Sequence, residues 1–179
     1  MNRRQLISYT LGTGAVLTVS LCALSLQGTT VVEPPKELQI LSTKEYSILF
    51  AVADILIPQN PPFPAASAMQ VALKVDMVIS TAIPEQQEQF KLVLALIENP
   101  SISTLLNFQT KPFTQSTESE RQHRLKAWRT GPFKLRSAFK ALNGMCNAAY
   151  YASKEVETLV GYNGPSSIIQ EIRKAKGYP

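Results

Sequence analysis

The chain contains one histidine, and its neighbours limit the chemistry that it could do. His123 lies among Glu118, Glu120, Arg121 and Arg124, on what would be the charged face of a helix. A metal site or a proton relay needs further ligands or an orienting partner, and the sequence has no second histidine and no pair of thiolates to supply them. We therefore expect His123 to face solvent rather than to act as a ligand or a base.

Asp54 is the carboxylate whose position first suggests a chemical role. It comes near the end of a predicted helix, beside an apolar stripe, but no second carboxylate has a spacing that suits acid–base catalysis. A role on the helix surface or in bonding a turn is therefore favoured. The sequence also lacks a glycine-rich phosphate loop, a nucleophile elbow and a cysteine pair. We predict no catalytic, cofactor-binding or metal-binding residues, which disfavours an independent enzyme.

The two cysteines cannot form a disulfide framework. Cys22 belongs to an apolar N-terminal run, which leaves Cys146 without an intramolecular partner. The favoured role for Cys146 is that of a small buried hydrophobe on a helix, and a reactive or intersubunit thiol is the alternative. The bulky Leu21 before Cys22 disfavours a lipid-modified cysteine.

The N-terminus has the pattern of an export signal. Arg3 and Arg4 precede Leu6–Leu26, a run without a formal charge. Paired arginines directly before Leu6 resemble the twin-arginine signal, which is read by the twin-arginine (Tat) translocase and exports folded proteins. No basic residue follows until Lys36, so general secretion of an unfolded chain is the alternative.

Residues 1–26 are therefore predicted to be a twin-arginine-type signal or a membrane anchor. The small residues of Ala23-Leu24-Ser25 would allow cleavage after Ser25, whereas about 20 apolar residues are also enough to span a bilayer if the segment is kept. Either outcome predicts the periplasm or the periplasmic face of the inner membrane.

The rest of the chain divides into a linker, residues 27–41, and a helical subunit domain, residues 42–179. Two adjacent prolines, Pro34 and Pro35, favour an extended, stiff spacer. Ser42 with Glu45 has the spacing of a capping box, so we expect a helix to begin there and to stop at Ile57, before a proline.

Apolar spacing and helix-start signals predict further helices along this domain. A helix is expected from Pro84, although Leu92–Ile97 could alternatively be a buried strand. A second capping box, Thr117 with Glu120, predicts another helix that ends at Gly131. The remaining predicted helices cover Ala65 to about Thr81, Pro100–Leu106, Phe133 to about Tyr151, Lys154–Val160 and Ser166–Lys174. The prediction is thus a single compact all-α domain of about five to seven helices.

Two features of this domain concern possible partners. Gly144 lies inside the longest predicted helix, so either a neighbour packs closely there or the helix bends. Aromatic residues form a stripe in and around this longest predicted helix. Core packing is the favoured role for the stripe, and part of it is available to a partner. The predicted interface residues are Trp128, Phe139, Tyr150, Tyr151 and Tyr162.

Charge does not favour nucleic acid as a partner, although the sequence pI is 9.3. Outside Arg3 and Arg4, 16 basic residues stand against 13 acidic ones, without blocks of lysine or arginine interleaved with aromatics. This balance is typical of an ordinary solvated surface.

Two motifs resemble the gluconate 2-dehydrogenase subunit 3 family. The first runs from Glu45-Tyr46 to Ala53-Asp54-Ile55-Leu56-Ile57-Pro58, and the second from Ala149-Tyr150-Tyr151 to Gly161-Tyr162-Asn163-Gly164-Pro165. The stretch Leu125–Arg129 before a long helix is also similar to that family, whereas the region Ile79–Ser116 matches it least. Asn163 stands where the family often has proline.

The resemblance implies an exported small subunit without catalytic residues. It implies an FAD-dependent large subunit of the glucose-methanol-choline (GMC) type as partner, often with a third subunit that carries haem c, and no cofactor bound by this chain. A flavoprotein without its own signal would cross the membrane folded, bound to this chain. A free-standing exported helical protein, which binds a small ligand or the envelope, is the alternative.

Overall fold

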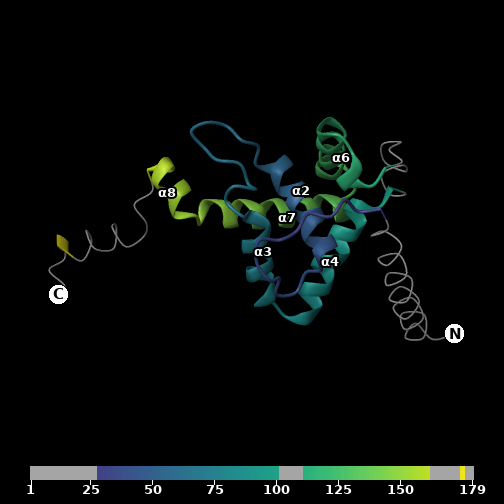
Figure 1. Cartoon of the computed structure of the whole chain (residues 1–179), viewed down its shortest axis with the longest axis horizontal. Coiled ribbons are helices and arrows are strands. Elements are labelled where there is room, and N and C mark those ends of the chain that lie inside the picture. Colours follow the sequence, from purple (N-terminus) through teal and green to yellow (C-terminus); the bar gives the residue numbers. More distant parts are fainter. Residues whose placement is uncertain (1–27, 101–110, 162–173, 176–179) are drawn as a thin grey trace.

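The computed structural model describes residues 28–100, 111–161 and 174–175 of the chain. This part forms six α-helices and one short 3-10 helix, η1, without a β-strand (Figure 1). The predicted all-α domain of five to seven helices is confirmed. The predicted signal, with Arg3, Arg4, Leu6 and Cys22, lies outside the described residues, as do nearly all of the two helices predicted for 100–106 and 166–174.

Helix α2, Thr43–Leu56, is the centre of the fold, and α3, α4, η1, α6 and α7 all pack against it. Its start is the predicted capping box: Ser42 Oγ accepts from the Glu45 N–H, while Glu45 Oε2 accepts from the Ser42 N–H at 2.8 Å. Its last residue is Leu56 and its C-cap is Ile57, the residue at which the sequence predicts the helix to stop. Half of its residues are buried, and Ile48, Leu49 and Val52 have no exposed surface.

Helix α3, Val71–Ser80, is shorter than the sequence predicts. The prediction of a helix from Ala65 is wrong for its first six residues, which form turns. Gln70 has a positive φ of 52°, in the left-handed region, and this interrupts any helix that would run through it. The turns before Gln70 are fixed to the end of α2, because the Ser67 N–H donates to Asp54 Oδ1 at 3.0 Å.

Helix α4, Pro84–Glu98, begins with proline in its first turn, as predicted. The helix includes Leu92–Ile97, so the strand alternative for that segment is excluded. Its buried residues, among them Phe90, Leu94 and Ile97, contact the core around α2.

The C-terminal half of the described chain starts with η1, Phe113–Gln115, and continues with α6, Glu118–Thr130, α7, Phe133–Tyr151, and α8, Lys154–Val160. The second predicted capping box, Thr117 with Glu120, starts α6. Helix α7 crosses the molecule, with α6 near its beginning and α8 at its far end (Figure 1). Gly144 is exposed on α7, and no atom of the described chain lies within 4 Å of where its Cβ would be.

Residues 28–41, which we call the N-terminal strap, form neither a helix nor a strand and are bonded to the helices along their length. The Thr30 N–H donates to Thr114 Oγ1 at 3.0 Å, and the Val32 N–H donates to Ser47 Oγ at 2.8 Å. Further along, Asp76 of α3 accepts three backbone N–H groups of the strap. The segment predicted as a spacer therefore packs as part of the folded domain.

None of the helices in the described part of the chain is both long enough and apolar enough to cross a membrane.

Candidate functional site

The residues singled out for chemistry lie apart from one another. His123 is exposed on α6. Asp54 is half-buried at the end of α2, where its Oδ1 accepts the Ser67 N–H at 3.0 Å, which confirms the predicted role in bonding a turn. Cys146 is fully buried on α7, and burial raises the pKa of its thiol to about 12, so it stays protonated and packs as a small apolar group.

The predicted interface aromatics occupy different environments. Trp128 is 1% exposed and Tyr150 is 3% exposed, so both are core residues of this chain, and neither can anchor a partner without unfolding. The Tyr150 hydroxyl donates to the Pro64 carbonyl at 2.6 Å, which fixes α7 to the proline-rich loop. Tyr151 is 53% exposed and remains available, Phe139 is half-buried, and Tyr162 lies outside the described residues.

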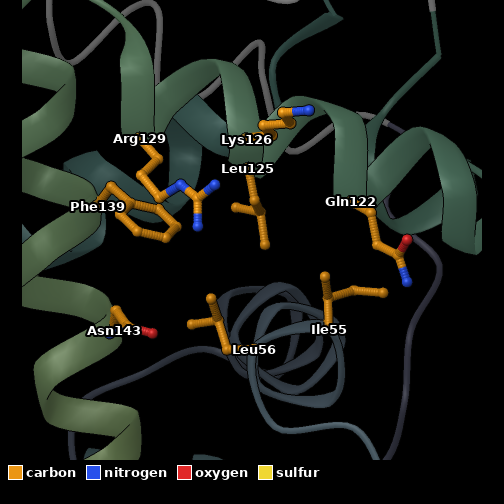
Figure 2. Close-up of a pocket in the computed structure, with 8 residues that line it drawn as sticks. All are labelled: Ile55, Leu56, Gln122, Leu125, Lys126, Arg129, Phe139 and Asn143. Carbon is orange, nitrogen blue, oxygen red and sulfur yellow. The ribbon is translucent and has the colours of Figure 1, made fainter.

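Phe139 lines a groove of about 290 Å³ between the end of α2, α6 and the first half of α7 (Figure 2). The groove combines apolar side chains with two cations and two amides. Its lining residues are Ile55, Leu56, Gln122, Leu125, Lys126, Arg129, Phe139 and Asn143.

Within this groove, the guanidinium of Arg129 points inwards beside Phe139, whereas Lys126 points away from it (Figure 2). The groove could hold an apolar or anionic group. It has no nucleophile or carboxylate among its lining residues, so the described geometry supports binding there rather than a reaction.

A buried polar network, which the sequence analysis did not identify, joins α4, η1 and α6. Glu98 has no exposed surface; its Oε2 accepts the Thr114 N–H at 3.0 Å and its Oε1 accepts the Thr114 hydroxyl at 2.6 Å. Arg124, also fully buried, donates to the Ile97 carbonyl at 3.0 Å and to the Lys111 carbonyl at 2.7 Å.

Two effects oppose each other at Glu98. Burial raises the pKa of its carboxyl, and the hydrogen bonds from Thr114 and Thr29 and the charge of Arg124 lower it, with burial the larger effect. Burial likewise lowers the pKa of Arg124 to about 10, although Glu98 and Glu120 raise it, so Arg124 stays charged at neutral pH. Because Thr29 and Thr30 bond to this network, it fixes the beginning of the N-terminal strap to the core.

Asp76 is the second buried carboxylate that the sequence analysis did not single out. Its Oδ2 accepts the Gln39 N–H at 2.6 Å, and its Oδ1 accepts the N–H groups of Ile40 and Leu41 at 3.2 Å and 3.0 Å. These three bonds hold the end of the strap directly before the cap of α2. The network at Glu98 and the bonds at Asp76 therefore fix the two ends of the strap separately.

Exposed apolar side chains concentrate at two corners of the molecule. At the turn between α3 and α4 these are Met77, Val78 and Ile83. At the junction of α7 and α8 they are Tyr151, Leu159 and Val160, which we call the α7–α8 corner. Within the described residues, no group of three or more histidine, cysteine, aspartate or glutamate side chains is placed to hold a metal ion. The two apolar corners are therefore candidate contact surfaces.

Comparison with known proteins agrees with this description. No curated protein and no solved structure matches the chain. The model of one family, described as gluconate 2-dehydrogenase subunit 3, matches residues 43–164, which begin with the first residue of α2 and end beyond α8. The match covers more than half of the sequence and every described helix, and the chain therefore belongs to the gluconate 2-dehydrogenase subunit 3 family.

Proposed function

We propose that this chain is the exported, non-catalytic small subunit of a flavin-dependent dehydrogenase that oxidises a sugar, a polyol or an alcohol. The family match over residues 43–164 carries the proposal, because its name describes a subunit of a dehydrogenase complex. In this proposal FAD belongs to a large subunit of the GMC type, haem c belongs to a third subunit where one is present, and this chain binds neither.

The N-terminal strap supports a role in exporting an assembled complex. Thr29 and Thr30 bond to Glu98 and Thr114, which come together only when α4 and η1 are packed. The segment that follows the predicted twin-arginine signal is therefore held on the body of the folded chain. A flavoprotein bound to that body would be carried by the same signal, and the twin-arginine route accepts folded cargo.

The α7–α8 corner is our proposed contact for the large subunit. Tyr151 is the one described member of the predicted aromatic set with most of its side chain exposed, and Leu159 and Val160 extend its apolar surface. An interface that outlasts export typically buries about 2,000 Å² or more around such anchors, so this corner would be the centre of a larger contact.

Replacement of Arg3 and Arg4 by lysine tests the export role. We expect both this chain and the flavoprotein to accumulate in the cytoplasm, because the twin-arginine receptor reads the guanidinium pair and not charge alone. Cell fractionation with an assay of periplasmic dehydrogenase activity measures the result. Exchange of exposed Lys36 and Lys44 for arginine is the matched control and should change neither location.

Normal delivery of both proteins by the lysine variant would contradict export by the twin-arginine route. If cells that lack this chain still export an active flavoprotein, and this chain is delivered independently of it, the result would instead favour the free-standing exported protein.

A further inference from the structure

One stretch of the sequence has a charge pattern that the net charge conceals. From Arg121 to Lys154 there are eight basic residues and no aspartate or glutamate. This stretch contains α6 after its first turn and all of α7. The structure therefore places only basic charges on α7 and on α6 after its first turn, and the acidic residues of α6, Glu118 and Glu120, are confined to that first turn.

Five cations of this stretch are exposed and unneutralised, whereas Arg121 and Arg124 bond to backbone carbonyls of the core. Lys126, Arg129, Lys134, Arg136 and Lys140 are partly or largely open to solvent. Within the described part of the chain, none of their side chains forms an ion pair or a hydrogen bond.

An aromatic side chain projects among these cations. Phe133 is the first residue of α7, after the turn at Gly131, and it is 73% exposed. Arg136 and Lys140 follow it at intervals of three and seven residues, so all three lie on the outer side of the helix. We call the exposed side chains of Lys126, Arg129, Phe133, Lys134, Arg136 and Lys140 the cationic end.

The cationic end lies on the same side of the molecule as the beginning of the N-terminal strap. Gln115 Nε2 donates to the Gly28 carbonyl, and Gln115 precedes α6 by three residues. In Figure 1 the start of the strap, α6 and the start of α7 share one end, and α8 lies at the opposite end. The predicted apolar run ends at Leu26, and two residues reach at most about 7 Å, so insertion of that run would hold this end close to a bilayer.

We propose that the cationic end rests on an anionic phospholipid bilayer, with Phe133 at the level of the lipid headgroups. The inference rests on the proposed function in one respect, namely that the N-terminal run brings the chain to a membrane. Clustered lysine and arginine with an exposed aromatic are the physical pattern of attraction to anionic lipid. Three of the five cations are lysines, which are depleted in protein–protein interfaces, so lipid fits this surface better than an acidic protein does.

A polarity-sensitive fluorophore on the full chain tests the proposal. The label is attached at Ser137→Cys, on the exposed face of α7, in a Cys22→Ser background where buried Cys146 does not react. The protein is reconstituted in vesicles of phosphatidylcholine, with or without phosphatidylglycerol, that contain a spin-labelled lipid as quencher. We expect strong quenching that requires phosphatidylglycerol, and little quenching of the same label at Glu155→Cys on α8.

Two triple variants separate specific from general charge effects. In one variant Lys134, Arg136 and Lys140 are changed to glutamine, which should lower the ratio of docked to undocked protein roughly 100-fold, because each cation near the surface contributes about fivefold. Quenching should then fall to the level in phosphatidylcholine alone. The matched control, with exposed Lys36, Lys44 and Lys154 changed to glutamine, should retain it.

Equal quenching in both kinds of vesicle, an equal loss in the control triple, or equal quenching at Glu155→Cys would overturn the proposal. If quenching shows no preference for phosphatidylglycerol, and flavoprotein added in a separate experiment protects the Ser137→Cys label, the surface contacts a protein instead. The vesicle assay needs only the purified chain, so its failure is distinguishable from failure of the proposed function. The chain can fail to dock on the vesicles while the flavoprotein still co-purifies with it, and it can dock on the vesicles when no flavoprotein co-purifies.

Discussion

At the scale of single residues, two buried carboxylates explain how the N-terminal strap is held. Asp76 and Glu98 have no exposed surface, and each accepts several hydrogen bonds, including bonds from the strap. A buried carboxylate with several donors is stabilised only while those donors stay in place. Both residues therefore join the folding of the helices to the position of the segment that follows the predicted signal.

Asp76→Ala should lower the free energy of unfolding by about 3 kcal/mol, because three backbone N–H groups lose a charged acceptor. Urea unfolding followed by circular dichroism measures this loss, and limited proteolysis should show new cleavage in the strap. Asp54→Ala, which removes one bond to Ser67, is the matched control and should cost about 1 kcal/mol. Equal losses for the two variants would show that the strap does not depend on Asp76.

Glu98→Gln should change how stability depends on pH. Burial raises the pKa of Glu98 above its ordinary value of 4.5, so the folded chain binds this proton more tightly than the unfolded chain. The resulting stabilisation is fully present below pH 4.5 and is lost as the pH rises through the folded pKa. In urea titrations across this range, the wild-type chain should lose stability relative to Glu98→Gln as the pH increases.

The control for the pH experiment is Glu88→Gln, because Glu88 is exposed and is paired with Lys91 at 3.1 Å. It removes the same charge without a change in a buried site. A pH profile for Glu98→Gln that runs parallel to wild type would contradict the raised pKa.

At the scale of helices, the elements with local start and stop signals could be predicted and those set by distant contacts could not. The two capping boxes, the first-turn proline of α4 and the stop at Ile57 depend on residues within one helical turn of each other, and all appear as predicted. The start of α3 depends instead on the left-handed Gln70 and on the bond from Ser67 to Asp54. Spacing alone gives no sign of either.

The candidate site shows the same division. The turn-bonding role of Asp54 follows from its place at a helix end. The burial of Glu98 could have been suspected from the sequence, since Glu98 follows Phe90, Leu94 and Ile97 on one helical stripe. The donors to Glu98 come from η1 and the strap, and the acceptors for Arg124 are the carbonyls of Ile97 and Lys111. All of them are more than ten residues away in sequence, and only the packed structure brings them together.

Gly144→Ala should raise the free energy of unfolding of the isolated chain by about 0.5–1 kcal/mol. A glycine within a helix costs backbone entropy, and an added Cβ at this position meets no atom within 4 Å. Thermal unfolding of the purified chain checks the gain, and Ala148→Gly on the same exposed face should produce a loss of similar size. A lower stability for Gly144→Ala would show that the described chain packs against this position after all.

At the scale of the whole molecule, contact surfaces are distributed along α7. The α7–α8 corner supplies exposed apolar side chains at one end, and the cationic end and the beginning of the strap lie at the other (Figure 1). Helix α7 has 19 residues and is about 28 Å long, which separates the two surfaces enough for different partners. In this arrangement one subunit could meet the flavoprotein and the membrane at the same time.

Purification of the tagged full chain from its native envelope tests the central claim most directly. The account predicts that a second polypeptide with the absorbance spectrum of flavin co-elutes in a fixed ratio. Tyr151→Arg with Leu159→Arg at the α7–α8 corner should lose that polypeptide, while the chain itself remains folded by circular dichroism. Elution of the wild-type chain as a stable, colourless monomer, from cells with an active dehydrogenase in the envelope, would contradict it.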